Sequence, residues 1–447
     1  MLPEQFTNRM KELLKEEYED FAACYGNDHA HSLRINPLKG SKEQYDQTSV
    51  FKQREPLKEQ VAWEENGFYY EDSLQPGKHP FHEAGVYYIQ EASAMAPAAI
   101  CKRADPDFVN SEDAEKSGTE NDTEGQREKK SSDDFRFFGE RILDLCAAPG
   151  GKSTQMAAAM AGRGILFSNE IHPARARILS ENIERMGIVN DIVLNHDPKV
   201  LAERFPSYFH RILVDAPCSG EGMFRKNEEA VEQWSLENVR LCAGRQEEIL
   251  ECAYTMLMGG GILVYSTCTW SPEENEEIVH WLLDTYDFDL LPVEHVNGMV
   301  AGIGLPETAR MYPHHFKGEG QFVAHLQFKG ENPAAKFKAS KTNLNREQQN
   351  LWQEFAQKHL KISLTGLLQT FGDQLYLLPE MLPDLGKLKI ARNGLHLGTF
   401  KKKRFEPSFA LGLALKPSQV KQRVEINDED FVKYVAGETV QLSEPRP

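Results

Sequence analysis

The strongest constraint on the fold is a regular alternation of short apolar runs with helical patterns between Arg141 and Phe328. The apolar runs are RILDLC, ILFSNE, DIVLN, HRILVDAP and GGILVYST, and amphipathic segments separate them. Strands that alternate with helices favour right-handed βαβ units in a parallel, doubly wound sheet. We therefore predict an α/β domain whose ligands bind beyond the carboxyl ends of its strands.

At 447 residues the chain is long enough for several domains. It begins with an expected amphipathic helix over residues 3–25, followed by a short strand within 32–39. We expect an N-terminal α+β domain (1–83), the α/β domain (84–330), a linker (331–343), a small C-terminal subdomain (344–385) and a basic C-terminal domain (386–447).

Charge is distributed unevenly along the chain. The net charge of −17 excludes a general polycation that would coat nucleic acid or anionic lipid. Residues 105–134 hold eleven acidic and four basic side chains, and we expect a solvated, mobile insertion at 104–134. Residues 386–423 hold ten basic side chains and one acidic one, with Phe400 and Phe405 beside the basic run. This stretch is the best candidate for RNA contact, the alternative being a solvated edge strand.

The seven cysteines have no regular spacing and no Cys-x-x-Cys pair, so we expect reduced thiols and no metal site. The N-terminal residues lack the apolar core of a signal peptide. No run approaches the roughly 18 apolar residues of a membrane span. We expect a cytoplasmic protein without membrane contact, and nothing requires more than a monomer.

LDLCAAPGGKST predicts a strand, a glycine-rich turn and the start of a helix, where backbone N–H groups and the helix dipole favour an anionic group. A P-loop needs glycine at the position of Cys146, so this motif is excluded, and the dinucleotide pattern is absent as well. The remaining ligand of this topology is a nucleoside. Glu170, at the end of the next strand, is placed to accept both ribose hydroxyls.

Two cysteines directly follow apolar strands: Cys218 in VDAPCSGEG and Cys268 in VYSTCTW. A buried cysteine is usually a small core residue, but both of these lie in polar loops. A thiolate beside a nucleoside cofactor suggests addition to C6 of a cytosine, which makes C5 nucleophilic enough to take a methyl group. Asp215, three residues before Cys218, can stabilise N3 as charge develops there.

CAAPGGK, DAPCSGEG and STCTWSPEENE occur in this order, with LRINPLK and GVYYIQEASA before them and RFEPSFALGLAL near the end. These motifs resemble those of the RNA 5-methylcytosine methyltransferases of the NOL1/NOP2/Sun family, over about residues 30–328. The arrangement is similar to that of a bacterial enzyme acting on 16S rRNA. The resemblance implies a Rossmann-like class I S-adenosylmethionine-dependent methyltransferase with a small N-terminal α+β domain and a PUA-like C-terminal RNA-binding region.

The resemblance also implies roles for individual residues. Cys268 is the expected nucleophile, Cys218 assists product release, and Lys152 lies near the target base. The expected S-adenosylmethionine contacts are Cys146, Ala147, Ala148, Pro149, Gly150, Gly151, Lys152, Glu170, Asp197 and Asp215, with Arg175 as a further contact. The expected RNA contacts are Arg34, Asn36, Lys401, Lys402, Lys403 and Arg404. For Arg34 and Asn36, a salt bridge or a turn hydrogen bond explains the residues equally well.

The expected partner is therefore RNA, with 16S rRNA or the small ribosomal subunit favoured. One alternative keeps the chemistry and changes the substrate to tRNA or another RNA. A second is a catalytically silent RNA-binding factor for ribosome assembly, in which the basic C-terminal stretch is the working part. A small-molecule methyltransferase would have no use for that stretch or for two thiols at strand ends.

Overall fold

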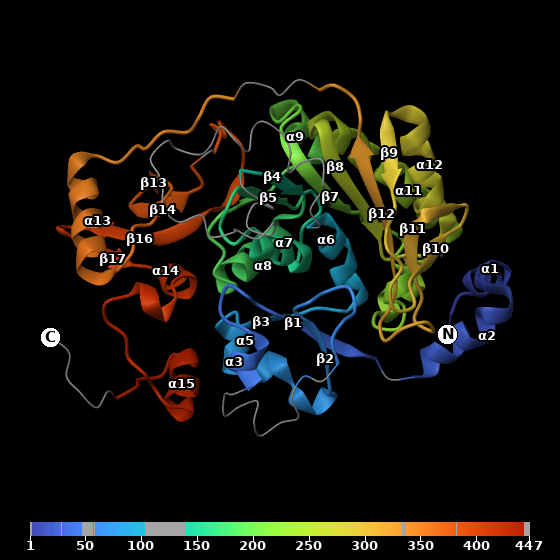
Figure 1. Cartoon of the computed structure of the whole chain (residues 1–447), viewed down its shortest axis with the longest axis horizontal. Coiled ribbons are helices and arrows are strands. Elements are labelled where there is room, and N and C mark those ends of the chain that lie inside the picture. Colours follow the sequence, from blue (N-terminus) through green and yellow to red (C-terminus); the bar gives the residue numbers. More distant parts are fainter. Residues whose placement is uncertain are drawn as a thin grey trace, which may run out of the picture.

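The computed structural model describes residues 2–27, 29–46, 57, 59–102, 139–332, 337–380 and 382–441. At its centre a ten-stranded sheet has the order β10-β11-β12-β8-β7-β4-β5-β6-β15, and β9 pairs with β12 (Figure 1). Its strands are β4 (Arg141–Asp144), β5 (Ile165–Asn169), β6 (Asp191–Leu194), β7 (Phe209–Asp215), β8 (Leu257–Thr267), β9 (Phe288–Leu291), β10 (Val300–Gly302), β11 (Leu305–Met311), β12 (Gln321–Phe328) and β15 (Ile390–Asn393).

Five neighbouring strands of this sheet, β6, β5, β4, β7 and β8, run parallel. The chain first builds outwards from β4 through β5 and β6, and then returns to the other side of β4 to form β7 and β8. This reversal creates a switch point between β4 and β7, where open α/β sheets bind their ligands. The topology confirms the predicted doubly wound domain, and β12 adds an antiparallel strand beside β8.

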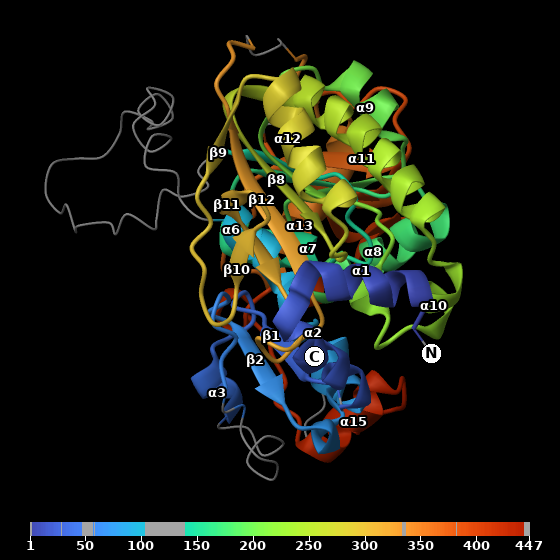
Figure 2. The ribbon, with the colours of Figure 1, turned by 90° about the vertical axis from the view of Figure 1, so that its right-hand side faces the viewer.

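Helices cover both faces of the sheet, which explains why its central strands are apolar on both sides. One face carries α6 (Ala96–Cys101), α7 (Gly151–Met160) and α8 (Pro173–Arg185), and the other α9 (Pro198–Arg204), α11 (Leu236–Met256) and α12 (Glu276–Thr285) (Figure 2). The short α10 (Glu228–Gln233) precedes α11. Leu143, Leu213 and Val264 in the strands are completely buried.

Residues 4–26 are helical but do not form the single helix expected over 3–25. Helix α1 (Glu4–Leu14) ends before Lys15, whose φ of +50° breaks the helix, and η1 (Lys15–Glu17), α2 (Tyr18–Ala23) and η2 (Cys24–Gly26) follow. The apolar face of these helices packs on the α/β domain, because Phe6 and Phe21 join one buried cluster with Trp270. The N-terminal helices therefore lie against the loop that contains Cys268.

The rest of the N-terminal region is a three-stranded antiparallel sheet in the order β2-β1-β3. Its elements are β1 (His31–Ile35), α3 (Lys42–Asp46), β2 (Gly67–Tyr70), α5 (Pro80–Glu83) and β3 (Tyr87–Ile89), with single turns η3 (Asp72–Leu74) and η4 (Pro76–Lys78), and η5 (Ser93–Met95) leads into α6. The third strand lies beyond the expected boundary at 83/84. The expected insertion at 104–134 falls outside the described residues.

The C-terminal region forms a four-stranded sheet in the order β13-β14-β16-β17, packed on α13. Its elements are α13 (Arg346–His359), β13 (Leu367–Phe371), β14 (Gln374–Leu378), β16 (Leu395–Lys401), β17 (Arg404–Pro407), α14 (Phe409–Ala414), η10 (Pro417–Gln419) and α15 (Asp428–Val435). The strands of this sheet come from both sides of the expected domain boundary at 385/386. β15, which lies between β14 and β16 in the chain, instead pairs with β6 at the edge of the central sheet.

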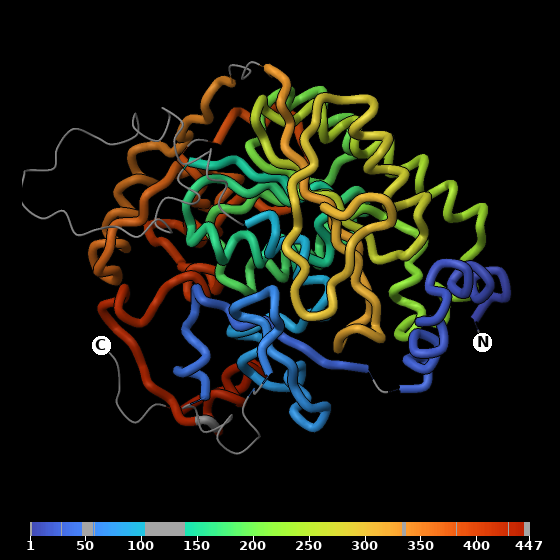
Figure 3. The backbone as a smooth tube through the Cα atoms, turned by 45° about the vertical axis from the view of Figure 1, so that its right-hand side comes forward, coloured from blue at the N-terminus to red at the C-terminus, as the bar shows by residue number. Residues whose placement is uncertain are grey.

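The end of the chain returns to the N-terminal domain, where α15 lies against α5 (Figure 3). The rings of Phe81 and Phe431 are 5.6 Å apart at this contact. Within the described parts of the chain, every helix is too short or too polar to cross a membrane.

Candidate active site

The loop between β4 and α7 positions backbone N–H groups at the switch point. Gly150 has a φ of +110°, a backbone conformation that residues with a side chain rarely adopt, so the turn favours glycine here. Helix α7 begins at Gly151, and the positive end of its dipole points toward this loop. The turn is therefore preorganised for a ligand with a carboxylate or another electron-rich group.

Glu170 follows β5 directly and is 3% exposed. Its Oε1 accepts a hydrogen bond from His172 N at 2.9 Å, and its Oε2 lies 3.2 Å from Arg175 NH1. Arg175 NH2 also donates to the carbonyl oxygen of Ala148 at 2.7 Å. Arg175 thus connects the acid at the end of β5 with the glycine-rich loop.

Asp197 lies at the N-terminus of α9, where its side chain accepts a hydrogen bond from Lys199 N at 2.8 Å. It shares one cavity of about 600 Å³ with Glu170. The cavity is lined by Leu145, Cys146, Ala148, Asn169, Glu170, Ile171, His172, Arg175, Asp197, Pro198, Lys199, Asp215, Ala216, Pro217, Cys218, Arg245, Glu248, Ile249, Cys252 and Cys268. Its size lies within the range of nucleoside and cofactor sites.

The two thiols of interest both line this cavity. Cys218 follows β7, Cys268 follows β8, and these strands are parallel neighbours in which Asp215 pairs with Ser266. The Sγ atoms of Cys218 and Cys268 are 3.3 Å apart. Their contact, together with burial, raises the pKa of Cys218 well above that of a free thiol. Cys218 is therefore a neutral S–H group that can donate a hydrogen bond to Cys268.

Asp215 forms the polar centre of the site. Its Oδ2 accepts a hydrogen bond from Lys152 Nζ at 2.7 Å. Its Oδ1 accepts from Ser266 Oγ at 2.7 Å and from Gln321 Nε2 at 3.0 Å. Burial alone would lower the pKa of Lys152, but the Asp215 carboxylate outweighs it and raises that pKa. The ion pair therefore keeps Lys152 cationic beside the thiols.

Gln321 was missed by the sequence analysis. It is the first residue of β12, which runs antiparallel to β8 with Phe322 opposite Thr267. This pairing brings the Gln321 side chain to Asp215. No local motif marks the residue, and only the antiparallel pairing brings it to the site.

Glu274 was also not predicted from the sequence, and its carboxylate holds the loop that contains Cys218. Its Oε2 accepts from Ser219 N and from Gln246 Nε2, each at 2.9 Å. Burial raises the pKa of Glu274 to about 7. The backbone next to Cys218 is thus fixed by a buried acid outside the cavity.

Glu221 ties the two cysteine loops together. Its Oε1 accepts from Ser271 Oγ at 2.6 Å and from Trp234 Nε1 at 3.0 Å. Its Oε2 accepts from Trp270 N at 2.8 Å. Since Glu221 follows Cys218 by three residues and Trp270 follows Cys268 by two, this buried carboxylate sets the spacing of the loops.

Replacing Glu221 by alanine is expected to lower the free energy of unfolding by about 3 kcal/mol, because three donors lose their acceptor in a buried site. Chemical denaturation followed by tryptophan fluorescence measures this loss. Glu232→Ala, on the exposed face of α10, is the matched control and should change stability by less than about 0.5 kcal/mol. Equal stabilities of the two variants would contradict the assigned role.

Arg34 and Asn36 are buried at the contact between the N-terminal sheet and the α/β domain. Arg34 is 1% exposed and donates to Thr154 Oγ1 at 2.8 Å and to the carbonyl of Gly151 at 3.1 Å. The Asn36 amide donates to the carbonyls of Gly85 and Met186 at 2.8 and 2.9 Å. Its Oδ1 accepts from Leu38 N at 3.1 Å, which is the turn hydrogen bond left open by the sequence. Neither side chain reaches the surface in this structure.

The basic run lies elsewhere, on the turn that joins β16 to β17. Lys401, Lys402, Lys403 and Arg404 are all exposed, and only Arg404 has an ion pair among them, with Glu406, within the described residues. Phe400 and Phe405 face each other across the strand pair with ring centres 5.3 Å apart. The three lysines are therefore available to a phosphate backbone.

A doubly wound sheet with a nucleoside-sized cavity at its switch point is the architecture of Rossmann-like class I methyltransferases. A solved structure of a methyltransferase homologue from Pyrococcus horikoshii has the same fold, with a TM-score of 0.59 and 26% identity over 73% of this chain and 95% of that one. NSun6 from the same organism matches with a TM-score of 0.58 and 21% identity over 74% and 99% of the two chains.

Sequence comparison identifies the family. The profile described as 16S rRNA methyltransferase RsmB/F matches residues 138–327, the N-terminal domain of RsmF matches 2–92, and the first C-terminal domain of RsmF matches 354–415. The ribosomal RNA small subunit methyltransferase F of Vibrio cholerae serotype O1 is 32% identical over 98% of this chain and 89% of its own, and that of Erwinia tasmaniensis is 30% identical over 98% and 88%.

The chain belongs to the RsmB/F family of 16S rRNA methyltransferases and is an RNA methyltransferase. The matches at both ends single out the RsmF type, which confirms the resemblance found in the sequence motifs. They also account for the N-terminal domain and the C-terminal sheet beside the class I fold.

Proposed function

We propose that this protein methylates C5 of a cytidine in 16S rRNA, with S-adenosylmethionine as the methyl donor and Cys268 as the nucleophile. The observation that carries the proposal is that two thiols, 3.3 Å apart, line the nucleoside-sized cavity together with Asp215, which is paired with Lys152. A methyl transfer that proceeds without a covalent enzyme–RNA intermediate would not require thiols in this position.

The cavity fits the proposed cofactor. Glu170 presents a buried carboxylate beside the end of β5, where ribose hydroxyls can donate to it. Asp197 is a second acceptor in the lining of the same cavity, and the loop at Gly150 offers backbone N–H groups. Residues 146–152, Glu170, Arg175, Asp197 and Asp215 would hold S-adenosylmethionine. When bound, it supplies an electrophilic methyl carbon to the site.

Cys268 is the thiol better placed to act as the nucleophile. The Lys152 ammonium interacts electrostatically with Cys268, and the neutral Cys218 thiol can donate a hydrogen bond to it. Both groups can stabilise the negative charge that the Cys268 sulfur carries when it attacks the ring. The thiolate adds to C6 of the cytosine, and the electrons of the C5–C6 double bond become available at C5.

Asp215 then stabilises the ring. As the thiolate adds, negative charge moves toward N3, and this nitrogen takes up a proton that the Lys152 ammonium passes through the Asp215 carboxylate to which it is hydrogen-bonded. The Asp215 carboxylate accepts a hydrogen bond from the resulting N3–H. Ser266 and Gln321 hold the carboxylate in place by donating to its Oδ1. Gln321 is therefore a positioning residue for Asp215.

Release restores both the ring and the enzyme. The C5 proton passes to water, its bonding electrons re-form the C5–C6 double bond, and the C6–S bond breaks to return the Cys268 thiolate. N3 gives its proton back to Lys152 through Asp215. Cys218, 3.3 Å away, assists this departure by donating its S–H toward the leaving sulfur.

The substrate must be an unstacked cytidine, because C5 and C6 have to be reached from both faces of the ring. Membership of the 16S rRNA methyltransferase family supports 16S rRNA as the substrate, and tRNA is the alternative to exclude.

The test compares methylation of naked 16S rRNA, assembled small subunits and tRNA, with the products identified by nucleoside digestion and mass spectrometry. 5-Methylcytidine in either 16S substrate supports the proposal; methylation of tRNA alone supports the alternative. RNA binding without any methyl transfer would indicate the silent assembly factor.

We further propose that the basic turn of the PUA-like C-terminal region binds the RNA backbone. Replacing Lys401, Lys402 and Lys403 together by glutamine is expected to lower the slope of log affinity against log salt concentration by about 2, since each phosphate contact contributes about 0.7 to 1. Filter binding at several salt concentrations measures the slope. Lys329→Gln, at the opposite end of β12 from the site, is the control; equal slopes for both variants would contradict the assignment.

A further inference from the structure

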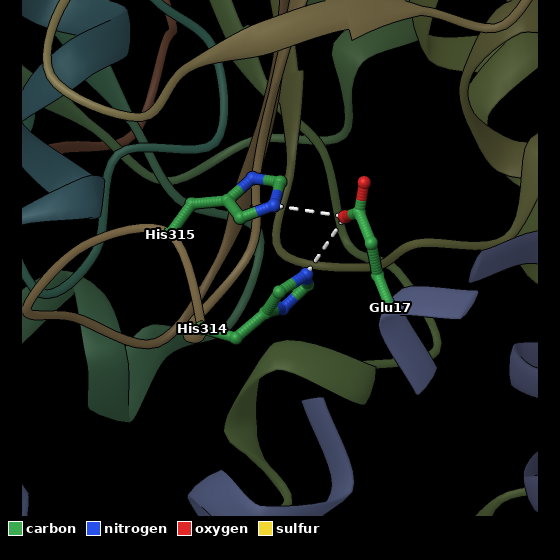
Figure 4. Close-up of side chains that lie close together, drawn as sticks. All are labelled: Glu17, His314 and His315. Carbon is green, nitrogen blue, oxygen red and sulfur yellow. Dashed lines mark hydrogen bonds and ion pairs between the residues drawn. The ribbon is translucent and has the colours of Figure 1, made fainter. Parts of the chain in front are cut away.

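Glu17, His314 and His315 form a cluster outside the cavity described above. Glu17 lies in the short turn η1 that separates α1 from α2, and the two histidines follow β11, before β12 begins. All three side chains point toward one another (Figure 4). Glu17 Oε2 lies 3.1 Å from His314 Nε2 and 2.9 Å from His315 Nε2. Two imidazoles thus converge on a single carboxylate oxygen.

The surroundings fix both rings in this orientation. The side chain of His314 is 4% exposed and that of His315 is 22% exposed. The ring of His314 packs edge-on against Phe21 at 5.8 Å. Within the described residues, the Nδ1 atoms of both histidines are buried without a hydrogen-bond partner. Among the described residues, the hydrogen bonds from the two Nε2 atoms to Glu17 are therefore the polar contacts that orient the two rings.

The backbone also contributes to the convergence. Lys15 has a φ of +50°, a region that a non-glycine residue rarely occupies, and this break between α1 and η1 turns the chain at Glu17. An uninterrupted helix over residues 3–25 would not contain this turn. Glu17 itself is 56% exposed, so one side of the cluster faces solvent.

The geometry points to a metal site: we propose that Glu17, His314 and His315 bind one first-row divalent cation of the Zn²⁺ type. The three candidate ligand atoms lie within 4.8 Å of one another. In a tetrahedral zinc site, bonds of about 2.0 to 2.2 Å place ligand atoms about 3.3 Å apart. The two nitrogen–oxygen distances of 3.1 and 2.9 Å require shifts of only a few tenths of an ångström.

The ligand types select the class of cation. Two imidazole nitrogens and one carboxylate oxygen suit Zn²⁺, Co²⁺ or Ni²⁺, whereas Mg²⁺ and Ca²⁺ prefer oxygen alone. The open side at Glu17 leaves room for a water molecule as the fourth ligand. The bound ion would connect the N-terminal helices to the loop that leads into β12, whose first residue is Gln321. Its role would be to fasten this segment to the site rather than to take part in the chemistry.

The test uses the full chain carrying Cys218→Ala and Cys268→Ala, so that the paired thiols do not compete for the metal. Titration with Co²⁺ is expected to saturate at one equivalent and to show weak visible bands without the strong ultraviolet absorption of a cobalt–thiolate bond. Competition with Zn²⁺ should remove the bands, and Zn²⁺ should raise the melting temperature of the protein.

Ligand variants made in the same background locate the site. Glu17→Gln and His315→Ala are each expected to weaken Co²⁺ binding by at least about tenfold. Glu16→Gln and His280→Gln, which change exposed residues of the same types, should bind as the parent does. Since Glu17 is more than half exposed, its variant should remain folded, which circular dichroism checks. The proposal is overturned by equal affinities in the ligand variants, or by no binding at ten equivalents of metal.

Discussion

Replacing Cys268 by alanine is expected to lower the rate of methyl transfer by at least about 10³-fold, since loss of a covalent nucleophile removes the reaction path rather than one contact. Cys268 lines the cavity but is not among the residues proposed to hold S-adenosylmethionine. Binding of S-adenosylmethionine should therefore change by less than about threefold. Single-turnover methylation and calorimetric titration measure these two quantities.

The control for this prediction is Cys24→Ala. Cys24 is a free thiol in the N-terminal helices, and it does not line the cavity. Its variant should retain the parent rate. A Cys268→Ala protein with more than about a tenth of the parent rate would exclude Cys268 as the nucleophile.

The second large effect is expected for Asp215→Asn. Asparagine keeps the shape of the side chain but removes the carboxylate charge that pairs with Lys152 and accepts the hydrogen bond from N3–H. Loss of a preorganised electrostatic contact of this kind costs about 10²- to 10³-fold in rate. We expect kcat to fall by this factor. Steady-state kinetics with saturating cofactor and RNA measure it.

The matched control is Asp284→Asn, an exposed acid on α12 that should leave kcat unchanged. If Asp215→Asn changed the affinity for RNA and left kcat within about fivefold of the parent, Asp215 would bind substrate without stabilising the ring. The proposed contact to N3 would then be wrong.

The fold around the cavity was predictable because its information is local. Each apolar run between Arg141 and Thr267 forms a parallel strand. Glu170 and Cys268 come directly after strands, Asp215 is the last residue of β7, and Cys218 follows it by three residues. The carboxyl ends of neighbouring parallel strands meet at one edge, so the sequence already placed these groups together. Asp197 reaches the same cavity from the start of α9.

Contacts that depend on distant pairing were not predictable. Gln321 reaches Asp215 only because β12 runs antiparallel beside β8, and β15 joins the central sheet from a segment expected to belong to a separate domain. A break at Lys15 in a strongly amphipathic pattern leaves no sequence signal, since lysine is a good helix former. The burial of Arg34 was not predictable either, because it arises where the N-terminal sheet packs against the α/β domain.

The central claim is the covalent bond between Cys268 and C6 of the target cytosine, and covalent trapping tests it most directly. The protein is incubated with S-adenosylmethionine and 16S rRNA fragments containing 5-fluorocytidine, whose fluorine cannot leave C5 as a proton does. We predict an adduct that survives denaturing electrophoresis, persists in Cys218→Ala and disappears in Cys268→Ala. An adduct that disappears only in Cys218→Ala, or no adduct with any RNA that the protein methylates, would contradict the proposed mechanism.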